Sequence, residues 1–345
     1  MIRLYSKAKR DLPWRRTSDP YAIWLSEAML QQTRVETVID YWTRFLVRFP
    51  DVASLASAEE EEVVALWSGL GYYRRARQLH AAAREVVDRF GGEFPRDAKT
   101  LQELPGIGRY TAGAVASIAF DAQEPLVDGN VARVFCRLFG FDGEPHSKAL
   151  ETSLWDKATE LVPKKRAGDW NQALMELGAT ICASTNPSCD ICPLKADCVA
   201  LQTNRVDELP RAKRKVVLVD VELELFLVER RGRVLLQRRA KDAGRMANMW
   251  ELPTIEATAS ALFPQQLEGV LLEPADELGV LRHSITRYRI RARVQRAKLV
   301  LGSKVRAPFK WHAPKDAGEL ALTGMTKKAL ARFSSRPAEP TVPLE

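Results

Sequence analysis

Apolar side chains in the first 200 residues recur at steps of three and four positions, which is the spacing of an amphipathic helix. Pro and Gly residues break this pattern into separate segments. The clearest segments span residues 21–46, 59–70, 73–90 and 153–162. Strand-like alternation is scarcely visible in this part of the chain. We therefore predict an all-α domain over residues 1–200.

The pattern changes to a period of two after LQTNRVDELPRAKRK, a polar and basic stretch that indicates a linker over residues 201–215. The apolar residues that fall on one face of the strand predicted next are Val217, Val219, Val221, Leu223, Leu225 and Leu227. Arg231-Gly232-Arg233 predicts a hairpin turn into a second strand. The expected fold is therefore multidomain, with the all-α domain followed by a smaller α/β domain over residues 216–335 and a Pro-containing tail at 336–345.

Residues 104–113, LPGIGRYTAG, place two glycines just before an apolar helical segment. Gly106 and Gly108 indicate a tight turn with exposed N–H groups, and Pro105 would end the helix before it. A turn that leads into a helix N-terminus suits an anion. We therefore predict a helix, a glycine hairpin and a second helix over about residues 99–120, with a phosphate-binding site at the bend.

The amino-acid composition and net charge of the chain indicate the class of its binding partner. The chain has 345 residues, 46% of them hydrophobic, and can bury a substantial core. Its net charge of +8 and pI near 9.3 indicate an anionic partner, for which nucleic acid is the leading candidate once a phosphate-binding hairpin is present. No secretory or membrane-spanning segment is evident, so we expect a cytoplasmic protein with no membrane partner.

Four of the five cysteines form a cluster with the spacing C-x6-C-x2-C-x5-C, at Cys182, Cys189, Cys192 and Cys198. Four thiolates on one short loop can enclose either a zinc ion or an iron–sulfur cluster, and the spacing does not decide between them. Four unrelated buried thiols are the alternative, which the close spacing disfavours. Cys136 stands in an apolar segment and is expected in the core.

Two carboxylates are candidates for general acid–base chemistry. Glu27 lies in an apolar helical segment, where burial would raise its pKa towards that of a general acid, although a flexible surface position is the alternative. Asp128 and Asn130, in VDGN, suit a turn and helix cap equally well.

The glycine hairpin LPGIG, the VDGN segment and the cysteine spacing together resemble the helix-hairpin-helix DNA glycosylases that carry a [4Fe-4S] cluster. Within this superfamily, LPWRRTSDPYAIWLSEAMLQQTRVETV and WSGLGYYRRARQL are similar to the adenine DNA glycosylases. The resemblance covers essentially the whole helical half. It implies that the four cysteines bind a [4Fe-4S] cluster. It also implies a base-excision repair enzyme, expected as a monomer, that removes adenine opposite 8-oxoguanine or G in double-stranded DNA.

The resemblance also implies catalytic roles. Glu27 matches the acid that protonates adenine at N7 and then assists water, Asp128 matches the residue that faces the sugar C1′, and Asn130 matches its polar partner. Tyr110 occupies the position where bifunctional members such as endonuclease III have a lysine that forms a Schiff base. Because tyrosine cannot form one, we predict a monofunctional glycosylase that leaves an abasic site.

Further residues match DNA and adenine contacts of the family. The enzyme must flip the adenine out of the duplex, and Gln32 and Tyr72 match the residues that wedge into the gap. The other expected DNA contacts of the helical half are Thr33, Pro105, Gly106 and Gly108. The expected adenine pocket consists of Arg10, Leu12, Trp14, Arg15 and Gln172, although Trp14 also suits the core and the arginines the surface. Arg74, Arg75 and Arg77 would contact phosphates or face solvent.

The C-terminal half resembles the MutT-like domain that recognises 8-oxoguanine in these enzymes. The glutamate-rich Nudix box is not visible, so we do not predict nucleotide hydrolysis. Where many members have Phe-Ser-His against 8-oxoguanine, this chain has Ile285-Thr286-Arg287. The hydroxyl of Thr286 and the guanidinium of Arg287 are the candidate contacts to the lesion or its phosphate.

Two alternatives compete with this interpretation. One is an endonuclease III-like glycosylase and lyase acting on oxidised pyrimidines, against which Tyr110, Glu27 and the additional C-terminal domain all argue. The other is a non-catalytic DNA-binding protein that uses its cluster as a redox sensor. This second alternative explains the basic charge, the hairpin and the cysteines, but it leaves the pair Glu27 and Asp128 without a purpose.

Overall fold

A computed structural model describes residues 2, 5, 6, 9–212, 216–257, 267–313 and 320–334. The chain forms two compact units, one made of Met1–Ala58 and Arg74–Arg214 and the other of Glu59–Tyr73 and Lys215–Glu345. The second unit is therefore discontinuous, which a single linker at 201–215 does not anticipate. The predicted tail at 336–345 and residues 213–215 of the predicted linker lie outside the described residues.

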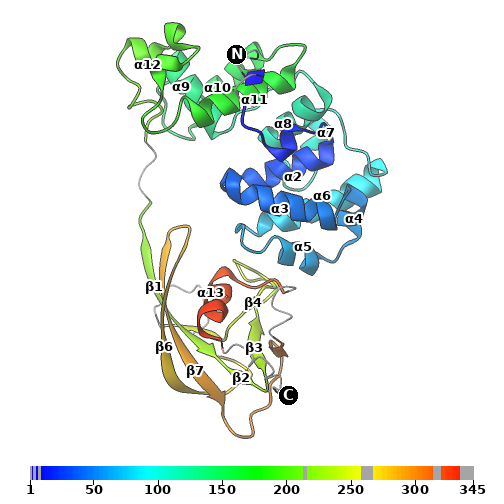
Figure 1. The fold of residues 1–345 in the computed structure, drawn as a ribbon, viewed down its shortest axis with the longest axis vertical. Coiled ribbons are helices and arrows are strands. Elements are labelled where there is room, and N and C mark those ends of the chain that lie inside the picture. The colour runs from blue at the N-terminus through cyan, green and yellow to red at the C-terminus, as the bar shows by residue number, and fades with distance from the viewer. Residues whose placement is uncertain are drawn as a thin grey trace, which may run out of the picture. The chain divides into compact units, whose positions relative to one another are not determined.

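The described part of the first unit is helical (Figure 1). Its α-helices are α2 (Pro20–Leu30), α3 (Val35–Arg48), α4 (Val52–Ser57), α6 (Arg74–Phe90), α7 (Ala98–Leu101), α8 (Arg109–Phe120), α9 (Gly129–Phe139), α10 (Lys148–Leu161), α11 (Ala167–Thr180) and α12 (Val199–Gln202). Short 3-10 helices are η1 (Pro13–Arg15), η2 (Cys189–Ile191) and η3 (Lys195–Asp197). The all-α fold predicted for this part of the chain is confirmed.

The segment predicted as one continuous run at 21–46 consists of two helices. Asp19 caps the start of α2 by accepting from the N–H groups of Tyr21 and Ala22 at 3.1 and 3.2 Å. The helix ends at Leu30, and Gln32 takes a left-handed conformation with φ +58° before α3 begins. The loop between these helices lines the cavity described below, as does Glu27 of α2.

The predicted helix-hairpin-helix is present as α7, the glycine turn and α8. Gly106 has φ +76°, and a Cβ atom there would lie 2.6 Å from Cβ of Gln78, so glycine is required for both conformation and space. Gly108 is the N-cap of α8. The N–H groups of the first turn of α8 are therefore available for an anion at the bend.

The second unit is an α/β fold, as predicted (Figure 1). Its helices are α5 (Glu60–Leu66) and α13 (Gly324–Phe333). One sheet has the order β5-β1-β7-β6, and the other has the order β2-β3-β4 with β8 paired to β3. The strands are β1 (Val219–Leu227), β2 (Glu229–Arg230), β3 (Arg233–Arg238), β4 (Trp250–Glu251), β5 (Thr254–Glu256), β6 (Leu272–Ile285), β7 (Tyr288–Leu299) and β8 (Phe309–His312).

The strand predictions hold with one correction at the start of β1. Val217 lies outside the strand and is 80% exposed, because the chain enters the sheet only at Val219. The turn predicted at Arg231 and Gly232 joins β2 to β3, with φ of +50° and +68° at these two residues. None of the helices in the described part of the chain combines the length and the apolar composition needed to cross a bilayer.

Candidate active site

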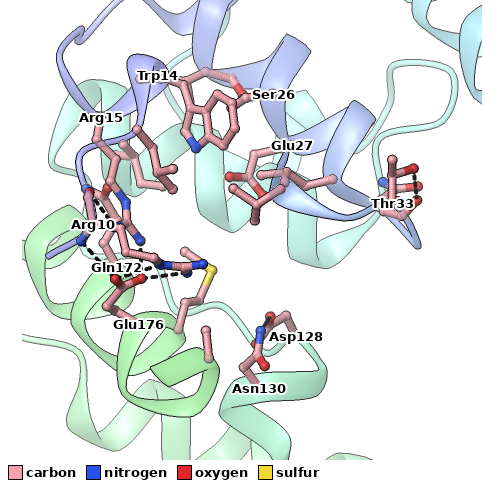
Figure 2. Close-up of a pocket in the computed structure, with 18 of the residues that line it drawn as sticks. Arg10, Trp14, Arg15, Ser26, Glu27, Thr33, Asp128, Asn130, Gln172 and Glu176 are labelled. Carbon is pink, nitrogen blue, oxygen red and sulfur yellow. Dashed lines mark hydrogen bonds and ion pairs between the residues drawn. The ribbon is translucent and has the colours of Figure 1, made fainter. Parts of the chain in front are cut away.

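A cavity of about 510 Å³ opens in the first unit between η1, α2, α8, α9 and α11 (Figure 2). Eleven of the predicted site residues line it: Arg10, Leu12, Trp14, Arg15, Glu27, Gln32, Thr33, Tyr110, Asp128, Asn130 and Gln172. They come from segments that are up to 162 residues apart in the chain, counted from Arg10 to Gln172. The fold therefore gathers the predicted catalytic and adenine-pocket residues around one space.

Glu27 is the buried acid of this cavity. It lies on α2, a helix with nine buried residues out of eleven, and is only 5% exposed. Burial raises the pKa of Glu27 to about 7, with the Tyr110 hydrogen bond and Arg15 opposing the rise and Asp128 adding to it. The flexible surface position considered for this residue is therefore wrong. A carboxyl group with this pKa can hold a proton near neutral pH and give it up during a reaction.

Tyr110 contacts this acid directly. It is the second residue of α8, and its hydroxyl donates a hydrogen bond to Oε2 of Glu27. The same hydroxyl lies 3.6 Å from Sδ of Met175 on α11. Burial, together with the neighbouring Glu27, raises the pKa of Tyr110 well above its usual value, so the phenol remains a donor. Tyr110 thus fixes the orientation of the Glu27 carboxyl group.

Asp128 caps α9 and at the same time lines the cavity. Its Oδ1 accepts from the N–H of Val131 at 2.7 Å, and its Oδ2 accepts from Nδ2 of Asn130 at 2.8 Å. Burial raises the pKa of Asp128, whereas these two donors favour its ionised form. The structural cap and the functional position are therefore compatible, and Figure 2 shows Glu27 and Asp128 entering the cavity from different helices.

Arg133 donates a hydrogen bond to the side chain of Asn130, and the sequence analysis did not predict this role. Its Nη2 donates to Oδ1 of Asn130 at 2.9 Å and to the carbonyl of Gly178 at 2.7 Å, and its Nε donates to the carbonyl of Cys182 at 2.8 Å. A Cβ atom at Gly178 would lie 2.6 Å from Cβ of Asn130, so glycine allows α9 and α11 to approach. One guanidinium therefore connects the Asp128 cap to the start of the cysteine loop.

Glu176 is a second residue that the sequence analysis missed. Its carboxylate accepts from the backbone N–H and Nε of Arg10 at 2.9 and 3.0 Å, and from the guanidinium of Arg15 at 2.7 Å (Figure 2). Although burial alone would raise its pKa, the bonds from both arginines lower the pKa of Glu176 to about 2. Glu176 follows Gln172 by one helical turn on α11, and this spacing was the available signal.

Gln172 and Trp14, two further residues of the predicted adenine pocket, also have defined contacts. The hydroxyl of Tyr5 donates to Oε1 of Gln172 at 2.9 Å, which fixes the orientation of the Gln172 amide group. Trp14 is 6% exposed and packs edge to face against Trp42 with ring centroids 6.0 Å apart. Trp14 therefore belongs to the core and to the cavity wall at once.

Other predicted residues do not line this cavity. Pro105, Gly106 and Gly108 form the hairpin of the first unit. Tyr72, Thr286 and Arg287 belong to the second unit.

Within the second unit, Tyr72 is 49% exposed with φ +48°. Thr286 turns the β6–β7 hairpin with φ +51° and accepts from Nη1 of Arg245 at 3.1 Å, and Arg287 donates to the hydroxyl of Tyr288 at 3.3 Å. Thr286 and Arg287 are thus presented at a hairpin tip.

The four clustered cysteines surround a second, smaller cavity. Cys182, Cys189, Cys192 and Cys198 all line it and are free thiols, whereas Cys136 is buried in the core as predicted. Among the described residues no three His, Cys, Asp or Glu side chains are gathered as one metal ion would require. Four thiols that line one cavity are the ligand set that a [4Fe-4S] cluster uses.

The comparisons with known proteins agree with this geometry. Residues 25–160 match the model of the HhH-GPD superfamily of base excision DNA repair proteins, and residues 225–332 match that of the NUDIX domain. The helical part is similar to the solved structure of a thermostable thymine-DNA glycosylase, with a TM-score of 0.53 and 32% identity over 59% of this chain and 93% of that one. An endonuclease III–DNA complex shares the fold, with a TM-score of 0.50 at 24% identity. The fold and the cavity thus define a base excision repair protein of the helix-hairpin-helix class.

Curated relatives resolve the family. The chain is 33% identical to the adenine DNA glycosylase of Schizosaccharomyces pombe over 315 residues, which cover 74% of this chain and 68% of the relative. It is 34% identical to that of Buchnera aphidicola subsp. Schizaphis graminum, covering 68% of this chain and 67% of the relative. The chain belongs to the adenine DNA glycosylase family. Its match to the Rattus norvegicus adenine DNA glycosylase is 51% identical but spans only 43% of that protein.

Proposed function

We propose that this protein hydrolyses the N-glycosidic bond of adenine in double-stranded DNA and leaves an abasic site. The observation that carries the proposal is the buried Glu27, with a pKa near 7, in one cavity with Asp128 and Tyr110. Glycosidic cleavage needs one carboxyl group that holds a proton and another that stabilises the developing positive charge on the sugar. Membership of the adenine DNA glycosylase family supports adenine as the base that is released.

In the proposed reaction, Glu27 protonates N7 of the extruded adenine, which turns the base into a better leaving group. Asp128 faces C1′ of the sugar, where its ionised form, supported by Asn130 and the N–H of Val131, stabilises the oxocarbenium-like transition state. Glu27, now ionised, assists the water that attacks C1′. Arg10, Leu12, Trp14, Arg15 and Gln172 form the pocket for the adenine.

Access to the glycosidic bond requires the adenine to leave the stack. We assign the filling of the gap to Gln32 and Tyr72. We also assign a DNA contact to Thr33, which follows Gln32 in the chain. The hairpin of Pro105, Gly106 and Gly108 supplies N–H groups for a backbone phosphate, and the net charge of +8 favours DNA in general.

The preference for adenine opposite 8-oxoguanine, over adenine opposite G, is assigned to the second unit. Thr286 and Arg287 occupy the tip of the β6–β7 hairpin, where a hydroxyl and a guanidinium can bind the lesion edge or its phosphate. We further propose a monomer that works in the cytoplasm, because four clustered cysteines suit a metal site in a reducing compartment.

The cysteine loop is proposed to hold a [4Fe-4S] cluster through Cys182, Cys189, Cys192 and Cys198. The four cysteines that line one cavity, together with the family of the chain, support this assignment. When bound, the cluster would tie η2, η3 and the end of α11 together. Arg137 would help to orient the loop, because its Nη1 lies 3.4 Å from Sγ of Cys182 and donates to the carbonyl of Ala183 at 2.7 Å.

An endonuclease III-like lyase remains the rival, and one experiment separates the two. Labelled duplexes with A opposite 8-oxoguanine, A opposite G, A opposite T and a thymine glycol are incubated with the protein, with and without hot alkali. We expect cleavage only after alkali, on the adenine strand, strongest opposite 8-oxoguanine. Strand scission without alkali on the thymine-glycol duplex would favour the lyase, and binding without any cleavage would favour a sensor.

A further inference from the structure

Arg75, the second residue of α6, reaches the end of the helix that carries Glu27. Its Nη1 lies 2.9 Å from the carbonyl oxygens of Ala28 and Met29 and 2.5 Å from that of Gln31, and its Nη2 donates to Oγ1 of Thr33 at 3.2 Å. The sequence analysis left Arg75 as a phosphate contact or a solvent-facing charge. Both interpretations are wrong, because the guanidinium is directed at the protein backbone.

These contacts have a clear electrostatic cause. The last carbonyl groups of α2 have no partner within the helix and form its negative end, which a guanidinium complements. The donors of Arg75 are fixed in a planar fork, so one side chain can bind several carbonyl groups and a hydroxyl in a set geometry. Lysine, with a compact ammonium group, cannot reproduce this arrangement.

The loop that Arg75 binds faces the cavity. Gln31, Gln32 and Thr33 all line it, and Gln32 holds a left-handed conformation that costs energy for a residue other than glycine. Arg75 contacts the residues on both sides of Gln32. Gln31 is also tied to α8, since its Nε2 lies 3.4 Å from Oγ1 of Thr111. The strained conformation of Gln32 is therefore supported from both flanks.

We propose that Arg75 is a positioning residue that holds the loop Gln31–Thr33 in the conformation that inserts Gln32 into the duplex. It acts by fixing the loop relative to Glu27 on the same helix, and it does not touch the substrate. The inference rests on the proposed function, since the inserted loop matters only for a base that must be extruded. It predicts that loss of Arg75 impairs extrusion and leaves the chemistry of an already unpaired adenine intact.

The test compares Arg75→Leu and Arg75→Lys with Arg84→Leu, a matched control at an exposed arginine further along α6. Single-turnover release is measured on a duplex with adenine opposite 8-oxoguanine and on one with adenine opposite an abasic analogue, where no pair has to be broken. We expect Arg75→Leu to slow the paired substrate by about 10- to 100-fold, the scale of a small misplacement, and the unpaired substrate by less than about threefold. The rate for Arg75→Lys on the paired substrate should fall between those of Arg75→Leu and the wild type, and Arg84→Leu should match the wild type.

A fluorescent adenine analogue beside the target reports extrusion separately from cleavage, and it should brighten less with Arg75→Leu. If Arg75→Leu slows both substrates equally, Arg75 has a general structural role, and if it slows neither, Arg75 has no role. Either result overturns the inference. The proposed function still stands in both cases if the wild-type chain releases adenine. If Arg75→Leu fails to fold, the inference is tested with Arg75→Lys, by the ratio of its release rates on the unpaired and the paired substrate. No release of adenine by the wild-type chain would overturn the proposed function itself, and the inference with it.

Discussion

The hydroxyl of Tyr110, in the first turn of α8, donates a hydrogen bond to the carboxyl group of Glu27 on α2. The bond joins two residues that are 83 positions apart in the chain, and both side chains are directed at the same cavity. It places a neutral donor where the lyases of this superfamily are expected to have a lysine. The acid that starts the proposed reaction is thus oriented by the residue on which the proposal of a monofunctional enzyme rests.

The pH dependence of adenine release should report Glu27. Its protonated form is the active acid, and its pKa of about 7 lies above the usual value for a glutamate, so the single-turnover rate should fall as pH rises through about 7. The rate should also fall at low pH, as Asp128 becomes protonated. Single-turnover rates from pH 5 to pH 9 with enzyme in excess of DNA test this. A flat profile above pH 6 would contradict the assignment of Glu27.

Tyr110→Phe should shift that profile in a defined direction. The hydrogen bond from Tyr110 lowers the pKa of Glu27, so its removal should raise this pKa further and move the falling limb to higher pH. The rate at the optimum should drop by about tenfold or less, because the carboxyl group loses an orienting partner and keeps its proton. Tyr41→Phe on α3, away from the cavity, is the matched control. A limb that stays in place or moves to lower pH would show that the bond does not favour the ionised carboxylate.

Asp128→Asn should separate the catalytic role of Asp128 from its role as a helix cap. Asparagine caps a helix about as well as aspartate, so the thermal unfolding midpoint should change by only a few degrees. Adenine release should fall by about 10²-fold or more, because a neutral amide cannot stabilise the positive sugar. Calorimetry and single-turnover kinetics on the same preparation provide both quantities. Loss of stability together with full residual activity would mean that Asp128 is only a cap.

Removal of one thiolate tests the cysteine loop. The purified protein should contain about four irons and four sulfides per chain, whereas Cys192→Ser should lower both and remove the visible absorption of the cluster. Cys136→Ser changes a buried cysteine away from the loop and should keep the full iron content. The iron and acid-labile sulfide of all three proteins are measured side by side. One zinc ion per chain and no iron in the wild type would overturn the cluster assignment.

The sequence predicted the class of each half of the fold and most of the cavity, because short motifs fix local conformations that the fold then brings together. Gly106, Asp128 and the helical spacing around Glu27 are examples, since each is constrained by its own segment. The break between α2 and α3 was missed because no Pro or Gly marks it. The loop there is held by Arg75, a residue more than 40 positions later in the chain.

The sequence analysis also missed the polar residues that bind the predicted site residues from distant parts of the chain. Glu176, Arg133 and Tyr5 act through residues that the motifs named, but none of the three belongs to a motif itself. Their partners are Arg10 and Arg15 for Glu176, Asn130 for Arg133 and Gln172 for Tyr5. Helical spacing pointed to Glu176 and Arg133 at one turn from Gln172 and Asn130, whereas only the tertiary structure brings Tyr5 to Gln172.

The measurement that tests the account most directly compares the wild type with Glu27→Gln on a duplex with adenine opposite 8-oxoguanine. Glutamine keeps the size and the hydrogen bonding of the side chain but cannot donate a proton to the base. We predict that release after alkali treatment falls by about 10²- to 10⁴-fold while binding of the same duplex, measured by fluorescence anisotropy, stays within about threefold. Unchanged release by Glu27→Gln would contradict the central claim that Glu27 is the catalytic acid.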